Sequence, residues 1–122
     1  MKKIVLMMLF FLSTSLFAFE EITDENFDEK IAGKNVIVDF HAIWWGSCKV
    51  LEKNMTKYAT STKPKDIYIY KVDVTKQKAT TKRFKAFGVP TLVYLEDGME
   101  VGRHSGVLSV EELEETVKEY FE

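Results

Sequence analysis

The sequence predicts one α/β domain, in which helices flank both faces of a central mixed β-sheet. Segments with apolar residues every three or four positions, typical of amphipathic helices, alternate with short runs of β-branched and aromatic residues, typical of strands. The chain has 122 residues, of which 46% are hydrophobic and 30% charged. That length and composition fit one globular domain and exclude a disordered tail, a collagen-like fibre and a protein with several membrane spans.

The first half of the domain is expected to begin with a short acidic helix, capped by Thr23 and closed by Gly33. Residues 36–41 are nearly all apolar, which predicts a central strand covered on both faces. A loop over residues 42–47 follows. The next helix is predicted from an apolar stripe with helical spacing, whose members are Cys48, Leu51, Met55 and Tyr58.

The second half is expected to add a strand, a helix, a hairpin and a final helix. These segments are residues 67–72, residues 79–87, the pair 91–95 and 99–103, and the residues after 109. Gly88 is predicted to close the helix, and Asp97 with Gly98 has the composition of a hairpin turn. Ser109 and Glu112 have the spacing of a capping box, which predicts where the last helix begins.

Residues 1–18 are predicted to be a secretory signal peptide. Lys2 and Lys3 precede an apolar run over residues 4–12, and small residues follow that run. Cleavage is expected after Ala18, with Ser15 as the alternative, so residues 19–122 form the mature domain. An uncleaved anchor is the other interpretation, but a membrane span needs about 20 apolar residues. The expected location is therefore the periplasm, with no membrane span after cleavage.

Charges are unevenly distributed along the mature domain. Removing residues 1–18 takes away only Lys2 and Lys3, so the formal net charge falls from -2 to -4. Residues 49–85 nevertheless hold eleven Lys or Arg and three acids, whereas residues 86–122 hold two basic residues and nine acids. No aromatic stacking platform lies between those lysines, which argues against nucleic acid as a partner. A solvated surface and a docking patch for an acidic partner are the interpretations that remain.

Four motifs resemble the thioredoxin family, and they span essentially all of the mature domain. They are Val-Ile-Val-Asp-Phe-His-Ala at residues 36–42, Trp-Trp-Gly-Ser-Cys-Lys at residues 44–49, Phe-Gly-Val-Pro-Thr at residues 87–91, and Asp97-Gly98 with Gly106. The resemblance implies a thioredoxin fold and a role in thiol-disulfide exchange in the cell envelope. The implied partners are protein thiols or disulfides, with an envelope electron donor as a further candidate, and no cofactor is implied.

The sequence departs from the family pattern at Trp45. Thioredoxins carry Cys-x-x-Cys, in which the first thiolate attacks a disulfide and the second thiol releases the product. Here Trp45 stands at the position of the first cysteine, and Cys48 matches the second. Because the chain has one cysteine, it can form neither an internal disulfide nor a complete dithiol cycle.

Three residues are candidates for thiol chemistry. Cys48 belongs to the apolar stripe, so burial is expected to raise its pKa and make it unreactive. Asp39 lies in an apolar strand, where it is either an acid paired with a lysine or hydroxyl or, as the resemblance implies, the buried acid that accepts the proton of the second cysteine. His41 points to the same face as Asp39, so an activated group of Cys48, His41 and Asp39 is a further hypothesis. Metal binding is not expected, because the sulfur and the two histidines lack clustered spacing.

Pro90 marks a candidate substrate groove. The resemblance implies that the peptide bond between Val89 and Pro90 is cis and faces the loop of residues 42–47, and that the backbone of Val89 pairs with an extended segment. The alternative is that Pro90 simply begins a strand. The residues expected to line the groove are Trp44, Trp45, Val89, Pro90 and Thr91.

Three functions stay open at this point. The first is an envelope protein of thiol-disulfide exchange in which Trp45 interrupts dithiol catalysis. The second is a redox-silent module that binds extended segments at the Pro90 groove. The third is a single-thiol protein that forms mixed disulfides through Cys48.

Overall fold

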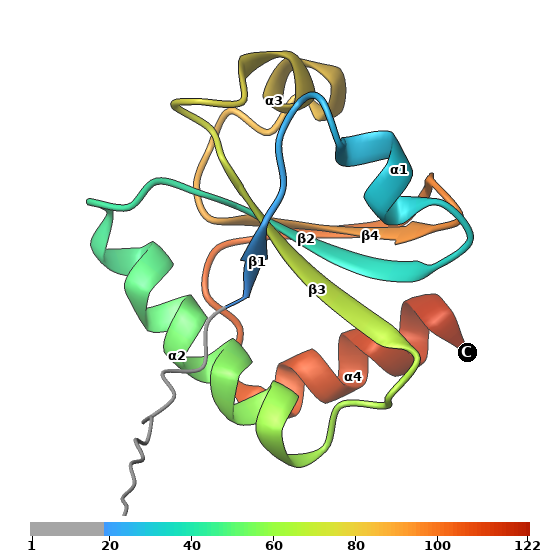
Figure 1. Ribbon diagram of the computed structural model, residues 1–122. Helices are drawn as coiled ribbons and strands as arrows, with labels where there is room; N and C mark the ends of the chain where they lie inside the picture. The colour runs from blue at the N-terminus through green and yellow to red at the C-terminus, as the bar shows by residue number, and fades with distance from the viewer. Residues whose placement is uncertain (1–18) are drawn as a thin grey trace, which may run out of the picture.

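The computed structural model describes residues 19–122, which form a five-stranded mixed sheet with helices on both sides (Figure 1). The elements are β1 (Glu20–Glu21), α1 (Phe27–Ile31), β2 (Asn35–His41), α2 (Gly46–Ser61), β3 (Ile67–Asp73), α3 (Lys78–Phe84), β4 (Thr91–Glu96), β5 (Met99–Ser105) and α4 (Val110–Phe121). The predicted α/β architecture with a central mixed sheet is confirmed. The predicted signal peptide, residues 1–18, lies outside the described residues.

The sheet has the strand order β1-β3-β2-β4-β5, so β2 lies at its centre. β2 runs parallel to β3 and antiparallel to β4. One face of β2 carries Ile37, which packs in a cluster with Leu51 of α2 and Leu113 of α4. The opposite face carries Val38, which packs with residues of α1 and α3. Figure 1 shows these pairs of helices on opposite sides of the sheet.

Local packing explains where the observed elements agree with the predicted ones and where they differ. All four predicted stripe residues of α2 are buried, and the capping box of Ser109 and Glu112 forms. The strand β1 was not predicted, because two residues are too few to give an alternating pattern. α2 begins at Gly46, inside the predicted loop.

The predicted end of α3 at Gly88 is wrong. The helix ends at Phe84, and Lys85 takes a left-handed conformation with φ 53°. In that conformation, the Lys85 N–H donates to the carbonyls of Lys82 and Thr81, which closes the helix as a glycine often does. Residues 85–90 are thereby released from the helix to form the loop that precedes β4.

One end of the sheet brings the predicted site segments together. Phe40, near the end of β2, pairs with Thr91, the first residue of β4, so the loop after β2 lies beside the loop before β4. The Val74 N–H donates to the His41 carbonyl at 3.0 Å, and the Gly106 N–H donates to the Pro90 carbonyl at 2.9 Å. We refer to this part of the molecule as the site end.

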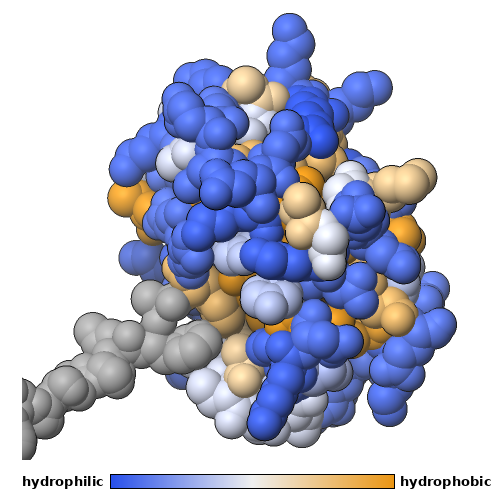
Figure 2. Space-filling model, turned by 45° about the vertical axis from the view of Figure 1, so that its right-hand side comes forward, coloured by the Kyte–Doolittle hydropathy of each residue, from blue (hydrophilic) through white to orange (hydrophobic). Residues whose placement is uncertain are grey.

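The surface is largely polar on the face drawn in Figure 2, where apolar residues are scattered among hydrophilic side chains. Within residues 19–122, none of the helices has the length and apolar character needed to cross a membrane.

Candidate functional site

Trp45 occupies the N-cap of α2. Its N–H donates to the Ala42 carbonyl at 3.1 Å, and its carbonyl accepts hydrogen bonds from the N–H groups of Cys48 at 3.1 Å and Lys49 at 3.3 Å. Its backbone is extended, and its side chain makes no capping hydrogen bond. Trp44 is 64% exposed and Trp45 is 49% exposed. The position that the resemblance assigns to an attacking cysteine is therefore filled by a large, half-exposed aromatic ring.

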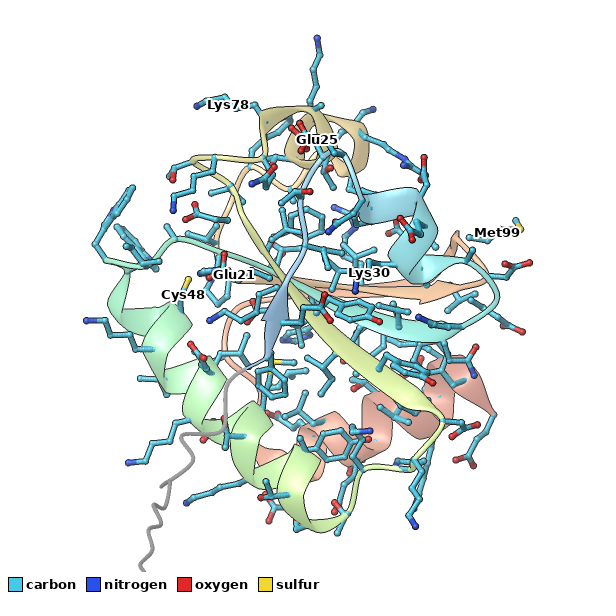
Figure 3. All side chains as sticks on the ribbon, in the orientation of Figure 1. Glu21, Glu25, Lys30, Cys48, Lys78 and Met99 are labelled. Atoms are coloured by element: carbon cyan, nitrogen blue, oxygen red, sulfur yellow. The ribbon has the colours of Figure 1, made fainter. Side chains whose placement is uncertain are left out.

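Cys48 is buried beneath this loop. It lies in the first turn of α2 and is 5% exposed (Figure 3). Burial raises the pKa of the Cys48 thiol, and the negative charges of Asp39 and Glu52 act in the same direction. A backbone hydrogen bond from Ala42 opposes them only in part. The thiol is therefore mainly protonated at neutral pH, as the sequence predicts for a cysteine in the apolar stripe.

Asp39 is a carboxyl group buried in the central strand. It is 1% exposed, and its Oδ1 has no hydrogen-bond partner. Burial raises the pKa of Asp39 to about 7, which the positive charge of Lys71 partly opposes and the negative charge of Glu52 reinforces. Lys71 stands opposite Asp39 in the pairing of β2 with β3, yet its ammonium group forms an ion pair with Glu52 at 3.1 Å. At neutral pH, Asp39 is consequently close to its own pKa, so its protonated and ionised forms are both populated.

His41 shares the face of Asp39 but is not bonded to the thiol. It is 4% exposed, its Nε2 has no hydrogen-bond partner, and burial together with the charge of Lys71 lowers its pKa. His41, Cys48 and Lys71 all line a small cavity of about 130 Å³. No hydrogen bond joins His41 to Cys48, and burial raises the pKa of the thiol, so this geometry does not favour the activated-thiol hypothesis, which stays a prediction to be tested. No cluster of three potential metal ligands occurs in residues 19–122.

The loop before β4 supplies the other side of the site. The peptide bond between Val89 and Pro90 is cis. Pro90 is buried and Val89 is half-buried. Thr91 is also buried, and its hydroxyl donates to the Gly88 carbonyl at 2.6 Å. Thr91 therefore holds the backbone of this loop and is not available to line a groove.

Two sets of residues at the site end were missed by the sequence analysis. Lys71 and Glu52 form a half-buried ion pair, and a lysine inside an apolar strand was the available signal for it. Ile43 and Phe87 are 58% and 73% exposed, an unusual degree of exposure for large apolar side chains. Together with the two tryptophans they form what we call the aromatic face: Ile43, Trp44, Trp45 and Phe87.

Comparisons with known proteins agree with this geometry. The sequence profile of the Thioredoxin family matches residues 18–119. The chain is 32% identical over 103 residues to thioredoxin of Staphylococcus saprophyticus, a match that covers 84% of this chain and 98% of that protein. It is also 37% identical over 101 residues to protein disulfide-isomerase A4 of Bos taurus, which covers 80% of this chain and only 16% of that longer protein.

Solved structures give the same result. A thioredoxin variant from Halobacterium salinarum NRC-1 superposes with a TM-score of 0.72 at 28% identity, covering 85% of this chain and 89% of the other. Thioredoxin of Fasciola hepatica superposes with a TM-score of 0.67 at 28% identity, covering 79% of this chain and 89% of the other. These matches confirm the predicted fold.

Asp39→Asn is expected to remove a pH-dependent cost of folding. The pKa of Asp39 rises from 3.8 to about 7 on folding, so the folded state binds the proton more tightly and loses stability as the pH rises through that range. The loss amounts to roughly 3 to 4 kcal/mol. The variant should therefore gain stability relative to the parent chain as the pH increases, measured as the difference in free energy of unfolding by urea between about pH 4 and about pH 8.

Asp73→Asn is the matched control for that experiment. Asp73 is also buried, and burial alone would raise its pKa, but hydrogen bonds from Thr75 and the charges of His41 and Lys76 together lower it. The ionised Asp73 carboxylate therefore stabilises the folded state at neutral pH. This stabilisation is lost at low pH, as the pH falls through the lowered pKa that Asp73 has in the folded state. A stability difference for Asp39→Asn that does not change with pH would contradict the raised pKa of Asp39.

Cys48 is expected to react slowly with iodoacetamide at neutral pH. Burial restricts access to the sulfur and keeps it protonated, so the rate should be at least about tenfold lower in the folded chain than in urea. His41→Phe should leave the slow rate unchanged, because His41 makes no hydrogen bond to the thiol. Fast alkylation that is lost on His41→Phe, followed by mass spectrometry, would restore the activated-thiol hypothesis.

Proposed function

Because the chain belongs to the thioredoxin family, we propose that it is an exported member that binds extended segments of proteins undergoing thiol-disulfide exchange, without completing a dithiol cycle itself. Members of this family act generally on protein thiols or disulfides. What distinguishes this chain is the separation of recognition from sulfur chemistry. The aromatic face is exposed, whereas Cys48, the single cysteine of the sequence, is buried.

The observation that carries this proposal is Trp45 at the N-cap of α2. A cysteine at a helix N-terminus is reactive because the free backbone N–H groups stabilise its thiolate. Trp45 places an indole there instead, and an indole can neither attack a disulfide nor form one. Cys48 lies one turn further along the helix, where burial keeps its thiol protonated. The chain thus has the cysteine that would release a product from a mixed disulfide, but it lacks the cysteine that would attack the substrate.

The loop before β4 supports the binding part of the proposal. Within residues 19–122, the N–H and carbonyl of Val89 make no hydrogen bond. Free backbone groups of this kind can pair with an extended segment as an added strand. Exposed indole rings nearby supply apolar area with little loss of side-chain entropy, which is the usual composition of a binding hot spot.

Export of the chain is supported by its first residues. Lys2 and Lys3 followed by the apolar run over residues 4–12 have the pattern of a signal peptide. A periplasmic location would also place the protein where disulfides form and persist. The intact mass of the protein purified from its native cells would identify the cleavage site and any group attached to Cys48.

An oxidoreductase is the second candidate, and the buried Asp39 favours it. Asp39 lies on the face of the sheet beneath Cys48, and its pKa of about 7 suits a group that takes up and releases a proton at neutral pH. This site would serve exchange chemistry if a thiol stood at position 45.

Trp45→Ala is expected to weaken binding of extended peptides at least about tenfold, because it removes a central aromatic contact. The measurement is fluorescence anisotropy of a labelled, cysteine-free peptide titrated with the protein. Tyr68→Ala is the matched control, since Tyr68 is an exposed aromatic residue on β3, outside the aromatic face. Equal affinities for the parent chain and the Trp45 variant would contradict the proposed binding site.

Trp45→Cys tests the second candidate. The new thiol would stand at the N-cap of α2 and could form a disulfide with Cys48, so the variant should reduce protein disulfides when dithiothreitol regenerates it. The parent chain should show only the background rate. Trp45→Ser is the control for removal of the indole without addition of a thiol, and an inactive Trp45→Cys chain that retains its fold would exclude the oxidoreductase candidate.

A further inference from the structure

We propose that the aromatic face selects segments of acidic proteins, because three exposed lysines surround it and none of them is paired. We call these lysines the basic rim: Lys49, Lys76 and Lys85. The inference rests on the proposed function, since it names the kind of segment that the same face binds.

The fold places the basic rim at the site end. Lys49 lies in the first turn of α2, four residues after Trp45, so both belong to the same side of the helix start. Lys85 is two residues before Phe87 in the loop that leads to β4. Lys76 lies in the turn after β3, where its N–H donates to the Asp73 carbonyl at 3.1 Å. β3 pairs directly with β2, so this turn adjoins the loop that carries the tryptophans.

None of the three lysines forms an ion pair within residues 19–122, although the charge of Lys76 acts on the Asp73 carboxylate and lowers its pKa. Within residues 19–122 the ion pairs join Lys30 with Glu20, Lys71 with Glu52, Arg83 with Asp28, and Arg103 with Glu100. All three rim lysines are exposed, and none takes part in these pairs. The loop segments 42–49 and 85–91 contain no Asp or Glu. The formal charges carried by these two loop segments themselves are therefore all positive.

Glu52 and Asp73 are the carboxylates nearest to Lys49 and Lys76 in the sequence, and Glu52 is engaged in the ion pair with Lys71. Asp73 is buried and accepts hydrogen bonds from Thr75, and Asp24 accepts hydrogen bonds from the backbone of Ala79 and Thr80 at the start of α3. Glu21 is the second residue of β1, which β3 separates from β2, and Glu25 follows that strand. The negative charge of Glu21 nevertheless reaches the site end, where it raises the pKa of His41 against the larger lowering by burial. Figure 3 shows Glu25 beside α3, away from the first turn of α2 that carries Cys48.

Charge complementarity at this face would act mainly on the rate at which an acidic segment associates with the protein. The formal net charge of residues 19–122 is -4, so the domain as a whole repels acidic chains, whereas the basic rim would attract them locally. Such an attraction orients the approaching segment toward the aromatic face and is screened by salt. The expected ligand is an extended, acidic segment that pairs with Val89 and places apolar side chains against Trp44 and Trp45.

The test uses three labelled peptides that share the same valine and serine residues at fixed positions. The other positions are all Glu in the first peptide, all Gln in the second and all Lys in the third. The Glu peptide should bind at least about tenfold more tightly than the Lys peptide at low salt, and about 0.3 M sodium chloride should remove most of the difference. The combined variant Lys49→Glu, Lys76→Glu, Lys85→Glu should reverse the order of the two peptides.

The matched control carries the same change of net charge on the other side of the molecule: Lys57→Glu, Lys65→Glu, Lys118→Glu, all at exposed positions. This control should keep the preference for the Glu peptide. If the variant with three Glu substitutions fails to fold, a variant with Gln at the same three rim positions replaces it. If all three peptides bind equally and Trp45→Ala abolishes this binding, the acidic preference is overturned and the proposed function still stands. Failure of every peptide to bind would overturn both.

Discussion

The burial of β2 between β3 and β4 is the constraint on which the rest of the structure depends. Hydrogen bonding on both edges and packing on both faces fix the direction and register of this strand. Asp39 and His41 are held on the side of the sheet that α2 covers. The chain must then leave the sheet beside the start of β4, and the loop with Trp44 and Trp45 is placed next to Pro90. Both the buried polar site and the aromatic face follow from that one strand.

The same constraint determines the electrostatics of the site. A carboxyl group in a strand that is buried on both faces loses its hydration, and a paired lysine would normally compensate for that loss. Here Lys71 is opposite Asp39 but forms its ion pair with Glu52, which lies closer to solvent. Asp39 therefore retains a raised pKa, and the Cys48 thiol above it is kept protonated by burial and by the nearby carboxylates. The interior favours neutral forms of both groups.

The surface at the site end has a different character from the interior beneath it. Trp45 occupies the N-cap of α2, the position from which free backbone N–H groups could stabilise an anionic side chain. The loops at this end carry exposed apolar side chains, exposed lysines and the backbone of Val89, which makes no hydrogen bond within residues 19–122. Under the proposed function, this surface would bind chains through backbone pairing, aromatic contacts and charge, none of which requires a sulfur atom. Recognition and sulfur chemistry can therefore be separated on one scaffold.

The sequence by itself determined the α/β fold, the buried stripe of α2, the capping box of α4 and the absence of a dithiol. These features depend on local periodicity, on neighbouring residues or on a count of cysteines. Only the tertiary structure decided that Lys71 pairs with Glu52, that Cys48 and His41 are not hydrogen-bonded, and that Phe87 and Ile43 join the tryptophans. The end of α3 at Lys85 was also decided there. Those features depend on distances between segments far apart in the chain, which the register of β2 sets and no local pattern encodes.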